Sequence, residues 1–237
     1  MKNVLLAGAV VLAAASPLSA APLPEGFVHL SEIDPTIIQD IRYAGAENFL
    51  GRRARGYDGA SCILTEKAAR ALRKVQGALA DEGLGLVVFD CYRPAAAVAD
   101  FVRWAREGGP ADPRWHPSTP RGNLIREGYI AARSGHSRGS TVDLGIVRLE
   151  ERSAGVPVEC GTRASTMLDF GTGFDCFDPK SRTASGAVGA DAQEHRRLLV
   201  RLMDEAGFRN YSGEWWHFTL RGEPYPKRVF DFPVTAP

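Results

Sequence analysis

SGHSRGSTVDLGI, residues 134–146, is the stretch from which the fold and the chemistry of this chain can both be approached. In its second half, Val142, Leu144 and Ile146 alternate with small or polar residues, among them Asp143. An alternation of period two predicts a β-strand whose apolar side chains share one face. Asp143 then lies on the opposite face, and a half-buried carboxylate at that position needs a positive partner or a metal ion.

Helices and strands are also predicted on both sides of this stretch. The expected elements are a helix over 65–82 with Thr65 as its cap, a strand over 84–89, a helix from Pro94 to Gly108, a helix over 191–206 opened by a capping box of Asp191 and Glu194, and a strand over 215–220. The proline-rich stretch 107–123 reads as a loop, and 150–190 as a long irregular excursion. No linker separates two apolar cores, so we predict a single α+β domain.

Composition sets limits on the class of protein. Of the 237 residues, 44% are hydrophobic and 24% are charged, a balance that argues against a disordered chain. The formal net charge is +1, so the chain lacks the excess of Lys and Arg that a general nucleic-acid binder needs. We expect no nucleic-acid partner, and the sequence does not define an oligomeric state.

The N-terminus has the pattern of a secretory signal peptide. Lys2 precedes an apolar run over 4–15, and small residues follow up to Ala21. We predict a signal peptide over 1–20, cut after Ala20, and a mature domain over 21–237. The alternatives are a cut after Ala21 or an uncleaved anchor, for which the run is short. The expected product has no membrane span after cleavage and is exported to the periplasm.

The four cysteines agree with export. An even number in an oxidising compartment suggests two disulfides, with three possible pairings. Sequence spacing favours Cys160–Cys176, which leaves Cys62–Cys91. The alternatives are free buried thiols or, less favoured, a reactive thiol, since no cysteine has a histidine close to it in sequence.

Polar residues suited to chemistry are concentrated in 90–94, 134–143 and 214–217. A zinc ion shared by His136, Asp143 and His217 would give the buried carboxylate its partner. Three protein ligands with a fourth position open to water are the pattern of a catalytic zinc site. Zinc in such a site lowers the pKa of bound water and polarises a carbonyl.

Two further residues suit catalysis beside such a metal. Glu214 lies three residues before His217, so it can face the same site and act as the general base. Arg93 lies between a buried strand and a helix, where a fixed guanidinium could stabilise an oxyanion. The alternative for Arg93 is a salt bridge with Asp90 or a place at a surface helix start.

Together these residues resemble the VanX-type D-Ala-D-Ala dipeptidases of peptidase family M15, within the wider D,D-peptidase/hedgehog fold group. The shared motifs are S-x-H-x-x-G-x-A-x-D at 134–143 and E-x-W-H at 214–217. Further matches cover Tyr-Ala at 43–44, Asn-Phe at 48–49, D-x-Y-R-P at 90–94, and the closing segments 223–226 and 230–233. The resemblance extends over about 28–234 and implies a mainly antiparallel sheet flanked by helices.

The resemblance also implies a role for each matching residue. These are one zinc ion per chain held by His136, Asp143 and His217, a catalytic base in Glu214, a transition-state stabiliser in Arg93, a substrate-binding hydroxyl in Ser134, a partner for the substrate ammonium in Asp175, and a pocket wall in Tyr43. Ser134 has the alternative of a simple turn residue. Thr141 departs from the motif, which has alanine there, and could alter the shape of the pocket.

The expected function is zinc-dependent hydrolysis of the dipeptide D-Ala-D-Ala to D-alanine, in cell-wall dipeptide turnover or recycling. A dipeptidase must hold both a free amine and a free carboxylate, which suggests a small enclosed pocket with 107–123 and 150–190 as candidate lids. The alternatives are a D,D-carboxypeptidase or an endopeptidase acting on peptidoglycan stem peptides, and a non-catalytic zinc-containing binding module. The presence of Glu214 and Arg93 counts against the last.

Overall fold

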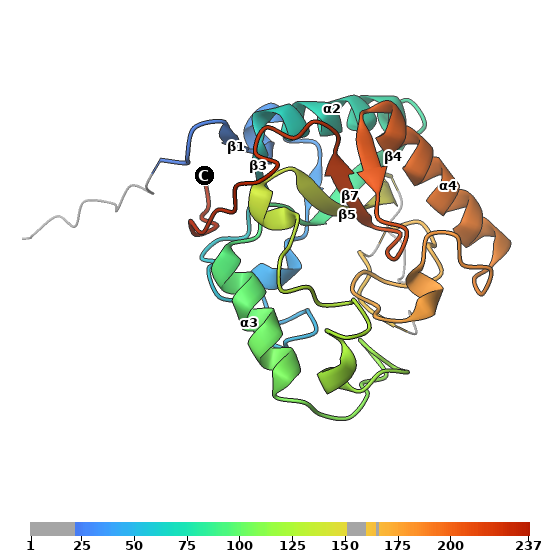
Figure 1. The fold of residues 1–237 in the computed structure, drawn as a ribbon. Helices are drawn as coiled ribbons and strands as arrows, with labels where there is room; N and C mark the ends of the chain where they lie inside the picture. Colours follow the sequence, from blue (N-terminus) through green and yellow to red (C-terminus); the bar gives the residue numbers. More distant parts are fainter. Residues whose placement is uncertain (1–21, 151–159, 165) are drawn as a thin grey trace, which may run out of the picture.

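The computed structural model describes residues 22–150, 160–164 and 166–237; the predicted signal peptide lies outside the described residues. A five-stranded sheet in the order β2-β4-β5-β7-β6 passes through the middle of the molecule (Figure 1). Its strands are β2 (Ile38–Gln39), β4 (Leu84–Asp90), β5 (Thr141–Arg148), β7 (His217–Leu220) and β6 (Phe208–Asn210). Strands β2 and β4 are parallel, whereas the other neighbours are antiparallel. The predicted mainly antiparallel α+β fold is confirmed.

A small second sheet and the helices complete the fold. The antiparallel strands β1 (Phe27–His29) and β3 (Ile63–Thr65) form the second sheet. The α-helices are α1 (Leu30–Ile33), α2 (Glu66–Ala80), α3 (Ala95–Arg106) and α4 (Ala190–Glu205), and the 3₁₀ turns are η1 (Arg42–Ala44), η2 (Arg121–Asn123), η3 (His136–Arg138) and η4 (Pro179–Ser181). Helix α3 lies across the sheet from α2 (Figure 1). Within the described ranges, we find no helix long and apolar enough to cross a membrane.

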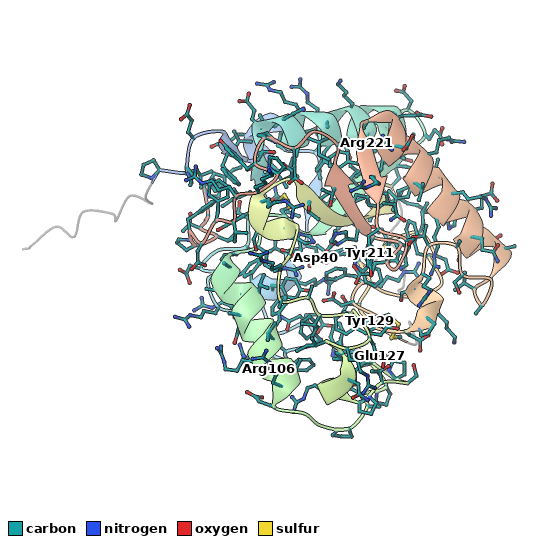
Figure 2. All side chains as sticks on the ribbon, viewed as in Figure 1. Asp40, Arg106, Glu127, Tyr129, Tyr211 and Arg221 are labelled. Carbon is teal, nitrogen blue, oxygen red and sulfur yellow. A yellow bond between two sulfur atoms is a disulfide. The ribbon has the colours of Figure 1, made fainter. Side chains whose placement is uncertain are left out.

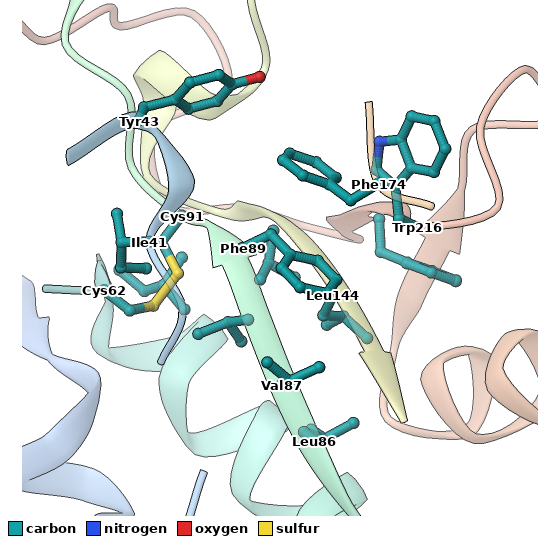
Figure 3. Close-up of a cluster of buried hydrophobic side chains, with 14 of the residues drawn as sticks. Ile41, Tyr43, Cys62, Leu86, Val87, Phe89, Cys91, Leu144, Phe174 and Trp216 are labelled. Atoms are coloured by element: carbon teal, nitrogen blue, oxygen red, sulfur yellow. A yellow bond between two sulfur atoms is a disulfide. The ribbon is translucent and has the colours of Figure 1, made fainter. Parts of the chain in front are cut away.

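The central strands are buried on both faces. All seven residues of β4 are buried, and so are the first seven of β5. Figure 3 shows Phe89 of β4 beside Leu144 of β5, with Phe174 and Trp216 packed nearby. Burial on both faces makes this strand pair a rigid support, and the candidate site lies at its end.

Most predicted elements are confirmed, with shifts at their ends. The capping box predicted for α4 is wrong: Gly189 is the N-cap, and Asp191 already lies in the first helical turn. Thr65 is at the N-cap of α2, but its hydroxyl pairs with Ser140 Oγ at 2.7 Å and does not cap the helix. The last strand begins at His217 because the two tryptophans before it lie in a turn.

Both favoured disulfides are present. Cys62 pairs with Cys91 and Cys160 with Cys176, with Cα atoms 5.3 and 5.0 Å apart respectively. The second bridge lies in the predicted excursion 150–190, of which residues 151–159 and 165 are outside the described part. Within the described residues of this excursion, the one helical turn that precedes α4 is η4. Two disulfides agree with an extracytoplasmic protein.

Candidate active site

Three acidic and basic residues form a row across the sheet, one on each of three neighbouring strands. The register pairs Asp90 of β4 with Asp143 of β5, and Asp143 with His217 of β7. Val88 pairs with Leu144, so an unbroken ladder would set Phe89 opposite Asp143. The register shift between Val88 and Asp90 brings the carboxylate there instead, as β-bulges beside functional sites commonly do.

His136 reaches the end of this row from η3, which is separated from β5 by two residues. Its Nδ1 lies 2.7 Å from the backbone oxygen of Cys91. Because a carbonyl oxygen can only accept a hydrogen bond, Nδ1 carries the proton and donates. The lone pair is then on Nε2, which lies 3.2 Å from Asp143 Oδ2 and 3.3 Å from His217 Nδ1. The ring is therefore held in the tautomer that a metal ligand needs.

His136, Asp143 and His217 converge on one point. One ligand atom from each lies within 4.8 Å of the others. Asp143 Oδ1 is buried and accepts no hydrogen bond of good geometry from any described residue, although His217 Nδ1 is 3.0 Å away. Two imidazole nitrogens and a carboxylate oxygen are a donor set suited to zinc and related ions. The residues present fit a metal ion.

The charges in this group influence one another strongly. Burial alone would raise the pKa of Asp143, but the imidazoles of His136 and His217 outweigh it and hold that pKa well below its usual range. For His217 burial acts to lower the pKa, and the neighbouring Asp143 carboxylate outweighs it and raises the pKa. The cluster thus keeps Asp143 in the anionic form in which a carboxylate binds a metal.

Glu214 lies in the turn that leads into β7. Its backbone N–H donates to the carbonyl of Tyr211, and its Oε2 lies 3.5 Å from His217 Nδ1. Burial raises the pKa of Glu214 to about 7, against the opposing effect of His217. A carboxylate in such a setting can both accept and return a proton.

Arg93 is held from several sides, and the salt bridge with Asp90, the alternative considered for this residue, is present. Its Nε donates to Asp90 Oδ2 at 2.8 Å, and a terminal nitrogen lies 2.7 Å from the same oxygen and 3.6 Å from Asp143 Oδ2. The guanidinium carbon also lies 5.0 Å from the ring centres of Tyr43 and Phe101. The salt bridge and a place in the site are therefore compatible, because Asp90 fixes the guanidinium that faces the cavity.

Tyr43 and Asp175 form a second polar pair on the cavity wall. The Tyr43 hydroxyl donates to Asp175 Oδ2 at 2.8 Å, and both residues are buried. Asp175 has a φ of 61°, a backbone conformation that non-glycine residues rarely adopt and that often marks a functional site. Burial, together with the negative charge of Asp143, raises the pKa of Asp175 well above its usual value. Among the described residues Asp175 makes no ion pair.

One cavity of about 320 Å³ is lined by His136, Asp143, His217, Glu214, Arg93, Tyr43 and Asp175. Asp90 is not part of the lining and acts on the cavity through Arg93. Ser134 lies on the cavity wall, and its hydroxyl also accepts the backbone N–H of His136, so it serves the turn as well. Thr141 is not among the lining residues, and its hydroxyl pairs with that of Thr219 at 2.9 Å.

The two segments named as candidate lids differ in what they contribute to the cavity lining. Asp175 and Phe177 come from the predicted excursion, but the other candidate lid, 107–123, provides no lining residue among those described. The wall is formed instead by 128–131 and 133–135, which follow that loop. Tyr129 and Tyr211, labelled in Figure 2, also line the cavity.

Sequence reasoning missed two contributors. Tyr57 donates to Asp90 Oδ1 at 2.5 Å from 33 residues earlier in the chain, and nothing in its local sequence signals this contact. Tyr211 lies with its ring centre 5.7 Å from that of His217. Tyr211 lies three residues before Glu214 in the sequence, and this closeness to the motif was the feature from which a place in the site could have been predicted.

An α+β domain with a His-Asp-His group of which His136 and Asp143 are buried, a neighbouring glutamate and a fixed arginine defines a metallopeptidase. The chain belongs to the D-Ala-D-Ala dipeptidase family, Peptidase M15, whose profile matches residues 24–235. The resemblance drawn from the motifs is confirmed.

Curated relatives support this membership over almost the whole chain. A D-alanyl-D-alanine dipeptidase of Enterococcus faecalis is 38% identical over 216 residues, covering 90% of this chain and all of the relative. One of Enterococcus faecium is 36% identical, covering 88% of this chain and 98% of the relative. One of Escherichia coli is 32% identical, covering 84% and 87% respectively.

Proposed function

We propose that this protein hydrolyses the peptide bond of D-Ala-D-Ala, using a zinc ion held by His136, Asp143 and His217. The convergence of these three side chains on the wall of a small cavity carries the proposal. The cavity volume, about 320 Å³, is near the lower end of the range for small-molecule pockets, which suits a substrate of two residues. The names of the relatives supply the identity of the dipeptide.

The donor set supports zinc as the metal. Two imidazoles and one carboxylate leave a fourth position for water or substrate, as in catalytic zinc sites. When bound, zinc would lower the pKa of a water molecule and polarise the scissile carbonyl.

Glu214 and Arg93 then perform separate tasks. Glu214 accepts the proton of the attacking water and returns it to the leaving amine, for which its position 3.5 Å from His217 is suitable. Arg93 donates to the oxygen on which negative charge develops. Its clamp by Asp90 and its stacking on Tyr43 keep it in place before the reaction, so little reorganisation is needed.

The cavity also has groups for both ends of a dipeptide. Asp175, hydrogen-bonded to Tyr43, is a buried carboxylate without an ion-pair partner among the described residues, and a substrate ammonium would be that partner. For the carboxylate end of the substrate, the exposed Arg133 lines the cavity and has no ion-pair partner among the described residues. Together with the Ser134 hydroxyl it supports binding of the free carboxylate.

The proposal includes the cellular setting. Residues 1–20 act as a signal peptide, and the mature domain 21–237 works in the periplasm. The two disulfides support an oxidising compartment.

The decisive test is release of D-alanine from D-Ala-D-Ala by purified residues 21–237, with chelator and with added zinc. L-Ala-L-Ala, N-acetyl-D-Ala-D-Ala and a stem pentapeptide run beside it. We expect cleavage of the free D,D-dipeptide alone, abolished by the chelator and restored by zinc. Cleavage of the pentapeptide would instead indicate a carboxypeptidase, and no cleavage by zinc-loaded protein would indicate a binding module.

The role of Glu214 has its own test. Glu214→Gln preserves the size of the side chain and removes the base, so kcat should fall by about 10²- to 10⁴-fold. The zinc content, measured by atomic absorption, should remain one per chain. Glu205→Gln, an exposed change at the end of α4, is the matched control. A near wild-type rate for Glu214→Gln would refute the assignment.

A further inference from the structure

The Cys62–Cys91 disulfide is one hydrogen bond away from the candidate metal ligand His136. Cys62 immediately precedes β3 and Cys91 immediately follows β4, so the bond joins the two sheets at the end of β4 (Figure 3). Both residues are buried.

One atom of Cys91 contacts a candidate metal ligand. The backbone oxygen of Cys91 accepts the Nδ1 proton of His136 at 2.7 Å, which selects the tautomer and sets the ring plane. Partners of this kind commonly change metal affinity by roughly 10- to 100-fold when they are lost. Whatever fixes the Cys91 carbonyl therefore fixes His136.

The backbone around Cys91 has little regular sheet structure to hold it. The ladder between β4 and β5 shifts register between Val88 and Asp90, just before the cysteine. Beyond it, Tyr92 N–H donates to the carbonyl of Ile63, the neighbour of Cys62, and Arg93 N–H donates to the carbonyl of His136 at 3.4 Å. The disulfide is the covalent link at the point where the ladder is interrupted.

We propose that the Cys62–Cys91 disulfide is a positioning element for catalysis: it fixes the Cys91 carbonyl that orients His136 and the backbone from which Arg93 projects. The inference rests on the proposed function only for its kinetic consequences. Its consequences for metal affinity and for the His136 tautomer do not depend on the substrate.

The second disulfide provides a matched control. Cys160 and Cys176 are also buried, and the Cys176 carbonyl accepts hydrogen bonds from the hydroxyl of Ser181 at 2.6 Å and the backbone N–H of Asp178 at 2.9 Å. Neither donor is a candidate metal ligand. Loss of this bridge should therefore affect stability without affecting metal affinity.

The experiment compares Cys62→Ala/Cys91→Val with Cys160→Ala/Cys176→Val, each in the full mature chain. In each variant the remaining pair is oxidised, so no free thiol competes for the metal. The zinc Kd is measured by competition with a chelator, the melting temperature on metal-free protein, and kcat and KM on D-Ala-D-Ala. For the first variant we expect a 10- to 100-fold rise in zinc Kd and a fall in kcat, with KM changed less than threefold. The second variant should keep the parental zinc Kd.

Equal zinc Kd values in both variants, with only melting temperatures lowered, would overturn the proposal and leave the bond as a structural brace. If the first variant does not fold, ¹⁵N chemical shifts of the histidine rings in metal-free wild type, oxidised and reduced, give a second measurement. We expect His136 to be protonated at Nδ1 when oxidised and to become a mixture of tautomers when reduced; an unchanged spectrum of folded, reduced protein would also overturn it. Absence of dipeptidase activity would count against the proposed function and leave both of these measurements valid.

Discussion

Replacing Tyr57 with phenylalanine removes one oxygen atom from the polar network beneath the candidate metal site. The Tyr57 hydroxyl donates to Asp90 Oδ1, and the other oxygen of the same carboxylate holds Arg93. Tyr57 and Asp90 are 1% and 0% exposed, so water cannot replace the missing donor without a rearrangement. The substitution therefore tests whether this buried network holds the guanidinium.

The magnitude follows from the charge of the acceptor. A hydrogen bond to a charged group contributes about 1.5–3 kcal/mol to the free energy of unfolding. In a chain of this length 1 kcal/mol corresponds to about 2–4 °C, so the melting temperature should fall by about 3–12 °C. The ring keeps its contact with Tyr43, 5.8 Å between centres, so little packing energy is lost. If half of this free energy is lost from the positioning of Arg93 in the transition state, kcat/KM should fall by about 4- to 13-fold.

The assays are urea and thermal unfolding of metal-free protein, followed by steady-state kinetics on D-Ala-D-Ala. Tyr92→Phe is the matched control, because the hydroxyl of this buried tyrosine donates to the neutral carbonyl of Phe232 at 2.9 Å. That change should cost only about 0.5–1.5 kcal/mol and leave kcat/KM unchanged. If Tyr57→Phe costs no more than Tyr92→Phe and leaves the kinetics intact, the network does not hold Arg93 and the reasoning is refuted.

Two further predictions concern stability. Gly139→Ala should destabilise the protein by about 2–5 kcal/mol in urea unfolding, because φ is 79° and a Cβ would overlap the ring of Phe27. Gly83→Ala is the control: φ is 69° but the space around it is open, so the change should cost only about 1–2 kcal/mol. Equal losses in the two variants would contradict the overlap argument. Asp100→Asn should cost about 1–3 kcal/mol at pH 7, because it removes the charge and replaces one of the two oxygens that accept from Arg52, at 2.8 and 3.0 Å, with an NH₂ group. Burial acts to raise the pKa of Asp100, but the Arg52 hydrogen bonds outweigh it and lower that pKa. The difference in free energy of unfolding between wild type and variant is therefore complete above pH about 4 and shrinks as the pH falls further. An equal difference at pH 7 and pH 3 would count against this charge effect.

The sequence predicts the long elements of this fold because their patterns are local. Helix α2 and strands β4 and β5 carry apolar periods long enough to identify. Strands β1 and β3 have only three residues each and form because they pair with each other across the chain, with Phe27 opposite Thr65, 38 positions later. No local pattern encodes such a pairing. The capping box for α4 failed for a similar reason, since the helix starts one residue before Asp191 and Gly189 takes the cap.

In the candidate site, too, the sequence predicts what is encoded locally and misses what depends on distant residues. His136 and Asp143 lie within one motif and Glu214 and His217 within another, so their chemistry can be recognised from spacing. The contacts that orient them come from distant residues. Tyr57 reaches Asp90 across 33 positions, and the Cys91 carbonyl reaches His136 across 45. Backbone carbonyls carry no sequence signal, so this part of the site required the structure.

The register of the sheet connects the fold to the chemistry. The alternation of Val142 and Leu144 that predicts β5 also fixes which face Asp143 occupies, since a slip of one residue would move it to the other face. The same register sets His217 beside it, and the bulge in β4 adds Asp90 to the row. Burial of the apolar side chains thus enforces the alignment of the polar ones. The ligand cluster is therefore stabilised by the core of the sheet, whose hydrophobic free energy offsets the cost of bringing Asp90 and Asp143 close together in a buried place.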